Sequence, residues 1–138
     1  MSAPEFLDSN VLVYAYDASD PAKRGVAQGL VRRAVAGELV LSTQVLAEFA
    51  TTLLHKLSPP VPAEDVITIL DTLSPIRLVA IDSGLIRRAV EARARYGLHF
   101  WDCMIVATAE RAGCKQLWSE DLNAGQEYFG VRVANPFN

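Results

Sequence analysis

The sequence predicts an α/β fold in which helices cover both faces of a mostly parallel central sheet. Short apolar segments alternate with longer segments of helical periodicity, which is the pattern of strands joined by crossover helices. Capping and turn residues separate these segments. The chain is 51% hydrophobic over 138 residues, enough for a sizeable core. In sheets of this kind, ligands bind at the carboxyl ends of the strands.

Composition predicts one domain over residues 1–138, because the chain has the length of a single compact unit. Charged residues make up 21% and the net charge is −3, which argues against disorder. The isoelectric point of about 5.3 argues against a strongly basic nucleic-acid binder. The mean hydropathy of +0.18 leaves an apolar surplus that favours a partner or a dimer. The apolar run 11–16 is too short to span a membrane, and no signal peptide is visible. We therefore expect a cytoplasmic protein, and in that compartment its two cysteines are expected to be free.

The first half of the chain is expected to contain two strands and three helices. Phe6-Leu7 ends a strand at the turn residues 8–10, whereas residues 11–16 fit either a continuing strand or a short helix. Pro21 suits a first helical position, with Asp20 before it as the cap. The further elements expected are a helix over 21–36, a strand over 38–41, a helix over 44–57 capped by Ser42 or Thr43, and a helix over 63–73.

The second half repeats the alternation of strand and helix. A strand near residues 77–81 precedes a helix that Asp82 or Ser83 caps and that stops near Gly97. The next helix opens at Phe100-Trp101 and ends at Ala112-Gly113. The remaining segments are expected to be a strand over 115–118, a loop over 119–126 and a short strand over 131–134.

Two aspartates directly follow predicted strands. Asp8 comes after the first strand and Asp121 shortly after the strand that ends at Trp118. Each, taken alone, fits a turn or helix cap. The carboxyl ends of parallel strands meet at one edge, however, so both side chains are expected at the ligand-binding edge of the sheet.

Asp102 lies near the start of a helix and shares a face with apolar residues. Ile105, Val106 and Ala109 follow it at helical spacing, which places its carboxylate on the buried side. A buried carboxylate needs hydrogen bonds, an ionic partner or a metal ion. The pattern fits a metal ligand and equally a first-turn aspartate that the helix amides satisfy.

Converging carboxylates would repel one another and raise one another's pKa values, and a divalent cation would remove this repulsion. Oxygen ligands suit Mg²⁺ or Mn²⁺, and the two histidines lack a zinc-type spacing. Glu48 lies at the edge of the apolar stripe of its helix, and periodicity alone favours a solvated glutamate there.

Four segments around these residues resemble the motifs of the PIN-domain family, and within it the VapC-type toxins of bacterial toxin–antitoxin pairs. Residues 6–12, 44–49, 100–107 and 118–122 resemble the four motifs in the family's order, and residues 130–136 resemble its closing strand. The four acidic positions of the motifs fall on Asp8, Glu48, Asp102 and Asp121. The adjacent Glu120 competes with Asp121 for the last role.

The resemblance implies a three-layer α/β/α sandwich and a metal-dependent ribonuclease that acts as a toxin. It implies Mg²⁺ or Mn²⁺ as cofactor, RNA as substrate, a homodimer and a small antitoxin as inhibitor. The four carboxylates would be the catalytic and metal-binding residues. Candidates for contacts to these carboxylates or to metal-bound water are Ser9, Asn10 and Ser119.

Two other functions use an acidic site of this kind. A haloacid-dehalogenase-like phosphatase would use Asp8 as nucleophile, but the second aspartate expected two positions later is Asn10 here. A non-catalytic, receiver-like module with an acidic pocket would need a late lysine beside the site. The late lysine of this chain, Lys115, opens a strand.

Overall fold

The computed structural model describes residues 2–138 as one six-stranded sheet with helices on both faces. Strands lie in the order β3-β2-β1-β4-β6-β5, and every neighbouring pair is parallel except β5 and β6. The elements are β1 (Glu5–Leu7), α1 (Ser9–Tyr14), α2 (Pro21–Val35), β2 (Leu39–Ser42), α3 (Thr43–His55), α4 (Ala63–Thr72), β3 (Arg77–Val79), α5 (Ser83–Tyr96), α6 (Phe100–Arg111), β4 (Gln116–Trp118), β5 (Glu127–Tyr128) and β6 (Val131–Ala134).

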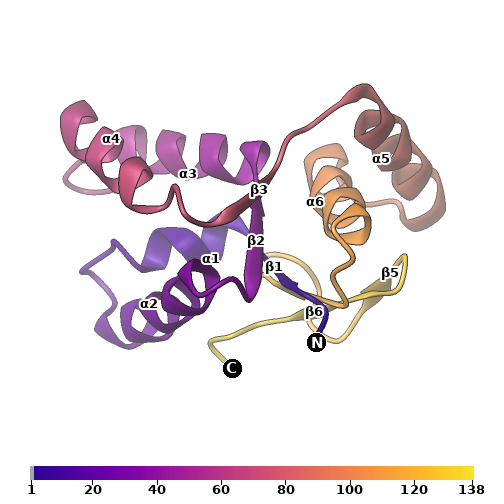
Figure 1. Ribbon diagram of the computed structural model, residues 1–138, viewed down its shortest axis with the longest axis horizontal. Helices are drawn as coiled ribbons and strands as arrows, with labels where there is room; N and C mark the ends of the chain where they lie inside the picture. The colour runs from indigo at the N-terminus through magenta and orange to yellow at the C-terminus, as the bar shows by residue number, and fades with distance from the viewer. Residues whose placement is uncertain (1) are drawn as a thin grey trace.

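The helices divide between the two faces of the sheet. Helices α1 to α4 lie on one side and α5 with α6 on the other, as Figure 1 shows. The chain first builds the sheet outward from β1 through β2 to β3, and then crosses to add β4 on the other side of β1. Because crossovers between parallel strands are right-handed, this reversal of direction sends the connecting helices to opposite faces. The predicted three-layer α/β/α sandwich with a mostly parallel sheet is confirmed.

The open question over residues 11–16 is settled in favour of a helix. Helix α1 begins directly after Asp8, which is its N-cap, and buries Val11, Leu12 and Val13. Three consecutive apolar residues fit a helix here because α1 is enclosed between α2 and α3, so more than one of its faces is covered.

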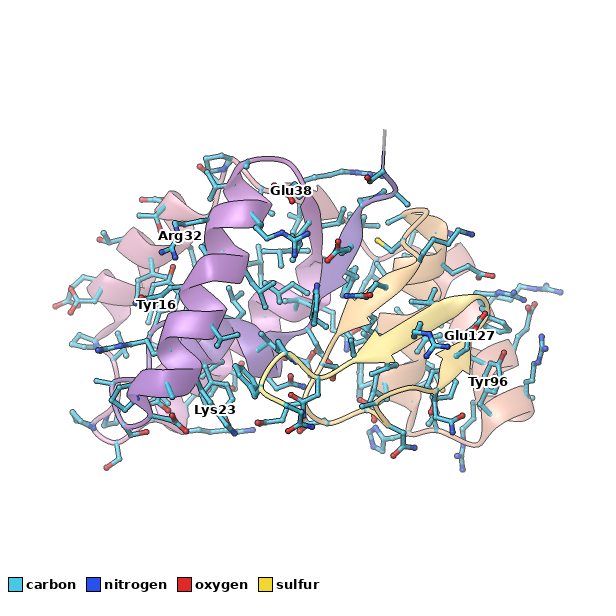
Figure 2. The ribbon with its side chains drawn as sticks, turned by 90° about the horizontal axis from the view of Figure 1, so that it is seen from below. Tyr16, Lys23, Arg32, Glu38, Tyr96 and Glu127 are labelled. Carbon is cyan, nitrogen blue, oxygen red and sulfur yellow. The ribbon has the colours of Figure 1, made fainter. Side chains whose placement is uncertain are left out.

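The sequence did not predict β5, which follows the expected loop and pairs with β6 as an antiparallel edge strand. A tight turn joins the two strands, and Phe129 in it adopts a positive φ of 51°. The backbone N–H of Phe129 donates to the hydroxyl of Tyr96, which lies beside this hairpin in Figure 2. Both cysteines are buried and free, as expected. The single-domain assignment of residues 1–138 stays a prediction.

Two groups of buried residues form the core. The larger one joins the sheet to α1–α4 and to one side of α6, and includes Phe6, Phe49 and Leu117. The smaller one lies between α5 and α6. Helix α6 is therefore covered on most sides, with Cys103 to Ala109 all buried. This packing fixes the first turn of α6, which carries Asp102, against the carboxyl edge of the sheet.

Candidate active site

A groove of about 880 Å³ opens at the carboxyl edge of the sheet. Helices α1 and α3 supply most of its lining, and the first turn of α6 and the loop after β4 complete it. Of the four predicted carboxylates, Glu48 and Asp121 line this groove. The strand order reverses between β1 and β4, so the groove lies where ligands bind in open α/β sheets.

Asp8 lies beneath the groove at the end of β1 and is almost completely buried, with 4% of its surface exposed. Its Oδ1 accepts a hydrogen bond of 2.7 Å from the backbone N–H of Ser9, and its Oδ2 accepts one of 2.9 Å from the Ser119 hydroxyl. Burial raises the pKa of Asp8 to about 6, although both hydrogen bonds act in the opposite direction. The negative charges of Glu48 and Asp102 raise this pKa further.

Asn10 and Ser119 connect the ends of β1 and β4. The side-chain amide of Asn10 donates to Oδ2 of Asp8 over 3.2 Å and to the Ser119 hydroxyl over 3.3 Å. Its Oδ1 accepts from the backbone N–H of Glu120 over 2.9 Å. These contacts set the position of the loop that carries Asp121. Ser9, Asn10 and Ser119 thus lie around Asp8, and their contribution to metal binding stays a prediction.

Glu48 extends from α3 into the groove. Helical periodicity favoured a solvated residue, and Glu48 is indeed exposed. Its exposed side faces the groove, which Asp121 also lines. Partial burial raises the pKa of Glu48, and the charges of Asp102 and Asp121 raise it further, whereas the hydrogen bond from Gln44 and the positive charge of Lys56 lower it.

Gln44, which sequence analysis did not single out, holds Glu48. Its Nε2 donates to Oε1 of Glu48 over 3.2 Å and to the backbone carbonyl of Trp101 over 3.0 Å. Both partners are acceptors, so the amide nitrogen must face them, and this leaves Oε1 buried without a partner among residues 2–138. The spacing of four residues between Gln44 and Glu48 on one helix was the available sequence signal.

Asp102 lies in the first turn of α6 and is partly buried. No hydrogen bond reaches its carboxylate from the residues that the structure describes, so the interpretation as a helix cap has no supporting contact. Burial raises the pKa of Asp102, the nearby His99 lowers it, and the charge of Asp121 raises it. Asp121 itself is exposed in the groove.

Glu120 is committed to a separate contact. Its Oε2 pairs with Nζ of Lys23 at 2.5 Å, and its Oε1 accepts a hydrogen bond of 2.8 Å from the Tyr14 hydroxyl. Lys23, labelled in Figure 2, projects from the first turn of α2. Since both carboxylate oxygens of Glu120 are occupied, Asp121 is the better candidate for the role over which the two residues competed.

The four carboxylates interact electrostatically but do not form a closed metal cage. No lysine or arginine within residues 2–138 makes an ion pair with any of them. In the same part of the chain, no three His, Cys, Asp or Glu side chains lie close enough to hold one metal ion together. The donor set is all oxygen, which suits a hard cation. Mg²⁺ commonly binds through one or two carboxylates and keeps several waters, so these residues fit a hydrated ion.

The fold and the sequence together identify the class of protein. The PIN domain family matches residues 6–126, and the chain belongs to this family. None of the curated proteins compared with the sequence matched it. No helix in residues 2–138 has the length and apolar character to cross a membrane.

Solved structures with the same fold include toxins of toxin–antitoxin pairs. Mycobacterium tuberculosis VapC20, described as a toxin that cleaves the sarcin-ricin loop, is 20% identical with a TM-score of 0.70, and the match covers 93% of this chain and 98% of that one. DNA-bound VapBC from Salmonella typhimurium is 16% identical, with a TM-score of 0.69 and coverage of 98% and 99%. A toxin–antitoxin complex from Klebsiella pneumoniae is 17% identical, with a TM-score of 0.69 and coverage of 96% and 97%. At these identities, the likeness establishes the fold.

Proposed function

We propose that this protein is a ribonuclease that depends on Mg²⁺ or Mn²⁺ and acts as the toxin of a toxin–antitoxin pair in the cytoplasm. The observation that carries the proposal is the convergence of Asp8, Glu48, Asp102 and Asp121 at one edge of the sheet with no cationic side chain paired to them. Like charges gathered in this way are typical of a site that binds a cation. RNA is the substrate class that the described activity of VapC20 supports.

The four carboxylates would hold the metal ion directly or through water. When bound, a divalent cation would supply positive charge for the phosphate oxygens and lower the pKa of a water molecule. Oε1 of Glu48 accepts from Gln44, so Oε2 is the oxygen left to orient an attacking water and accept its proton. Ser119 and Asn10 would keep the Asp8 carboxylate aimed toward the groove from below.

The role of Asn10 counts against the phosphatase alternative. Asn10 stands where the second aspartate of such a phosphatase is expected, and its side chain is occupied in joining Asp8 to the backbone N–H of Glu120.

The test is cleavage of RNA by the purified chain with Mg²⁺, Mn²⁺ or excess EDTA. Cleavage is expected with either ion and not with chelator. Asp121→Asn, purified in the same way, is the control for contaminating nuclease, because it keeps the shape of the side chain but weakens ligation of a hard cation. Full activity of the native chain in excess EDTA, with the Asn form inactive, would contradict the metal dependence.

A homodimer and a small antitoxin are the proposed protein partners. The neighbours described as VapBC and toxin–antitoxin complexes support the antitoxin. Exposed apolar side chains on several helices support further association: Val26, Val35, Ile67, Ile86 and Val90. Light scattering at micromolar concentration should give the mass of a dimer, and a small protein encoded beside this chain should co-purify with it and inhibit cleavage. A monomer would count against the first partner, and failure to inhibit against the second.

A further inference from the structure

Trp101 is exposed at the mouth of the groove, directly beside Asp102. Of its surface, 51% is accessible, and it is the one aromatic residue among the large apolar side chains exposed in residues 2–138. It lines the same groove as Glu48 and Asp121. An exposed indole offers a flat aromatic face beside a polar site, which makes Trp101 a candidate contact for substrate.

Two contacts fix the backbone and the ring of Trp101. Gln44 donates to its backbone carbonyl over 3.0 Å, which ties the first turn of α6 to α3. The Phe100 ring meets the indole edge-to-face, with centroids 5.2 Å apart and planes at 76°. Phe100 itself packs against the buried residues between α5 and α6. The backbone and one side of the ring are therefore supported, which suits a rigid platform.

The groove continues away from Trp101 along one face of α3. Gln44, Glu48, Thr52 and Lys56 line it at intervals of four residues, so they form a stripe about 18 Å long at 1.5 Å per residue. Lys56 is the cationic residue of the lining, and it forms no ion pair within the part of the chain described. An aromatic surface, a set of carboxylates and a lysine thus follow one another along the groove.

We propose that Trp101 is a stacking platform for an unpaired RNA base next to the phosphate that is cleaved, and that Lys56 contacts a backbone phosphate farther along the groove. The inference rests on the proposed ribonuclease function and names two residues that would hold the RNA substrate beside the carboxylates. Bases of single strands stack on aromatic side chains, whereas bases inside a duplex are covered by their neighbours. A protein contact is the less favoured explanation, because Trp101 lines the groove together with Glu48 and Asp121, whereas the exposed apolar residues of α2, α4 and α5 do not line it.

Tryptophan fluorescence tests the platform separately from cleavage. The chain has two tryptophans. Trp118 ends β4, and its backbone carbonyl accepts from Asp8, but its indole N–H donates to Glu5 at the start of β1 and the residue does not line the groove. Trp118→Phe therefore leaves Trp101 as the reporter. A short single-stranded RNA should quench its emission saturably in Ca²⁺, a hard cation that takes oxygen ligands, with RNA integrity checked on a gel. A duplex of the same sequence should quench much less.

Substitution gives the second measurement. Trp101→Leu keeps apolar bulk but removes the aromatic face, so the affinity for single-stranded RNA should fall about tenfold and KM should rise by a similar factor. Trp101→Phe should recover part of both. Lys56→Gln should weaken binding and reduce its dependence on salt. Thermal melts establish that each variant is folded.

The outcomes separate this inference from the proposed function. Metal-dependent cleavage with native affinity in Trp101→Leu, and no quenching in Trp118→Phe, would overturn the platform and leave the ribonuclease. Quenching by single-stranded RNA without cleavage under any metal would support the platform and overturn the ribonuclease. Loss of the dimer or of antitoxin binding in Trp101→Leu, with unchanged RNA affinity, would assign Trp101 to a protein interface and overturn the platform. Absence of both quenching and cleavage would overturn both.

Discussion

At the scale of single residues, the contacts of Asp102 distinguish between its two interpretations, a functional carboxylate and a structural helix cap. It stands in the first turn of a buried helix, yet no hydrogen bond from residues 2–138 reaches it, and burial raises its pKa. A structural aspartate in this position would accept bonds from helix amides and have a lowered pKa. These two features are what we expect of a residue retained for the proposed function at some cost in stability, and the following prediction tests it.

Asp102→Asn should abolish cleavage, because a neutral amide is a poor ligand for a hard cation. In EDTA the variant should be as stable as the native chain or more stable by about 0.5–2 kcal/mol, because the substitution removes like-charge repulsion. Cleavage assays and denaturant unfolding measure the two effects. Retained cleavage together with a loss of stability would remove Asp102 from the site and weaken the assignment of all four carboxylates.

The raised pKa of Asp8 leads us to expect an unusual pH dependence of stability. Its pKa is about 6 in the folded chain, against 3.8 for an ordinary aspartate. Between these values the folded state binds more protons than the unfolded state, so the free energy of unfolding in EDTA should rise by about 1 kcal/mol as the pH falls from 7 to 5. Below that range, carboxyl groups with lowered pKa values, such as Glu5 and Asp82, reverse the trend.

Urea unfolding at several pH values measures this dependence. Asp8→Asn, which cannot titrate, should show a smaller rise over the same interval. A native chain that loses stability steadily from pH 7 to pH 5 would show that Asp8 is not held in the buried environment described here.

At the scale of secondary structure, α3 positions two groove residues through its cap. Ser42 is the last residue of β2 and the N-cap of α3, so strand and helix join without a loop. Its hydroxyl accepts from the backbone N–H of Val45 over 3.1 Å and is completely buried. Gln44 and Glu48 follow within the next two turns, so their placement depends on how the helix begins.

Ser42→Ala should lower the free energy of unfolding by about 1–2 kcal/mol, because it leaves a buried helix amide without its acceptor. It should also reduce kcat/KM at temperatures where the chain stays folded. Thr68→Ala is a matched control, since Thr68 is exposed on α4 and its hydroxyl bonds only within its own helix. Equal denaturation midpoints for the two variants would contradict this role of the cap.

At the scale of the whole molecule, metal binding and folding should be coupled. The four carboxylates come from segments spread over most of the chain, so only the folded protein brings them together. An ion that binds the folded state preferentially raises the free energy of unfolding, by about 2.7 kcal/mol when its concentration is one hundred times Kd. The melting temperature rises with the ion concentration for the same reason. Mg²⁺ should therefore stabilise the native chain more than Asp102→Asn or Asp121→Asn. An equal shift for all three at matched ionic strength would exclude specific binding to this site.

The sequence by itself determined the fold class and most of the elements. Alternating apolar segments, the proline at the start of α2 and the cap Asp20 are local signals, and each has the predicted place in the structure. For α3 and α5 the sequence left two candidate caps each, and the structure selects Ser42 over Thr43 and Asp82 over Ser83. The motifs also named four acidic positions, of which Glu48 and Asp121 line the groove, and their role as a metal site stays a prediction. Local patterns suffice here because capping and periodicity act within one or two helical turns.

Only the tertiary structure decided how distant segments meet. Residues 11–16 are compatible with strand or helix until α2 and α3 enclose them. The crossing of the chain from β3 to β4 brings Ser119 within 2.9 Å of Asp8, 111 residues away. Glu48 faces a groove, and Gln44 joins it to Trp101, because α6 from the opposite layer begins beside α3. Such contacts depend on the packing of whole layers against the sheet, which no local pattern encodes.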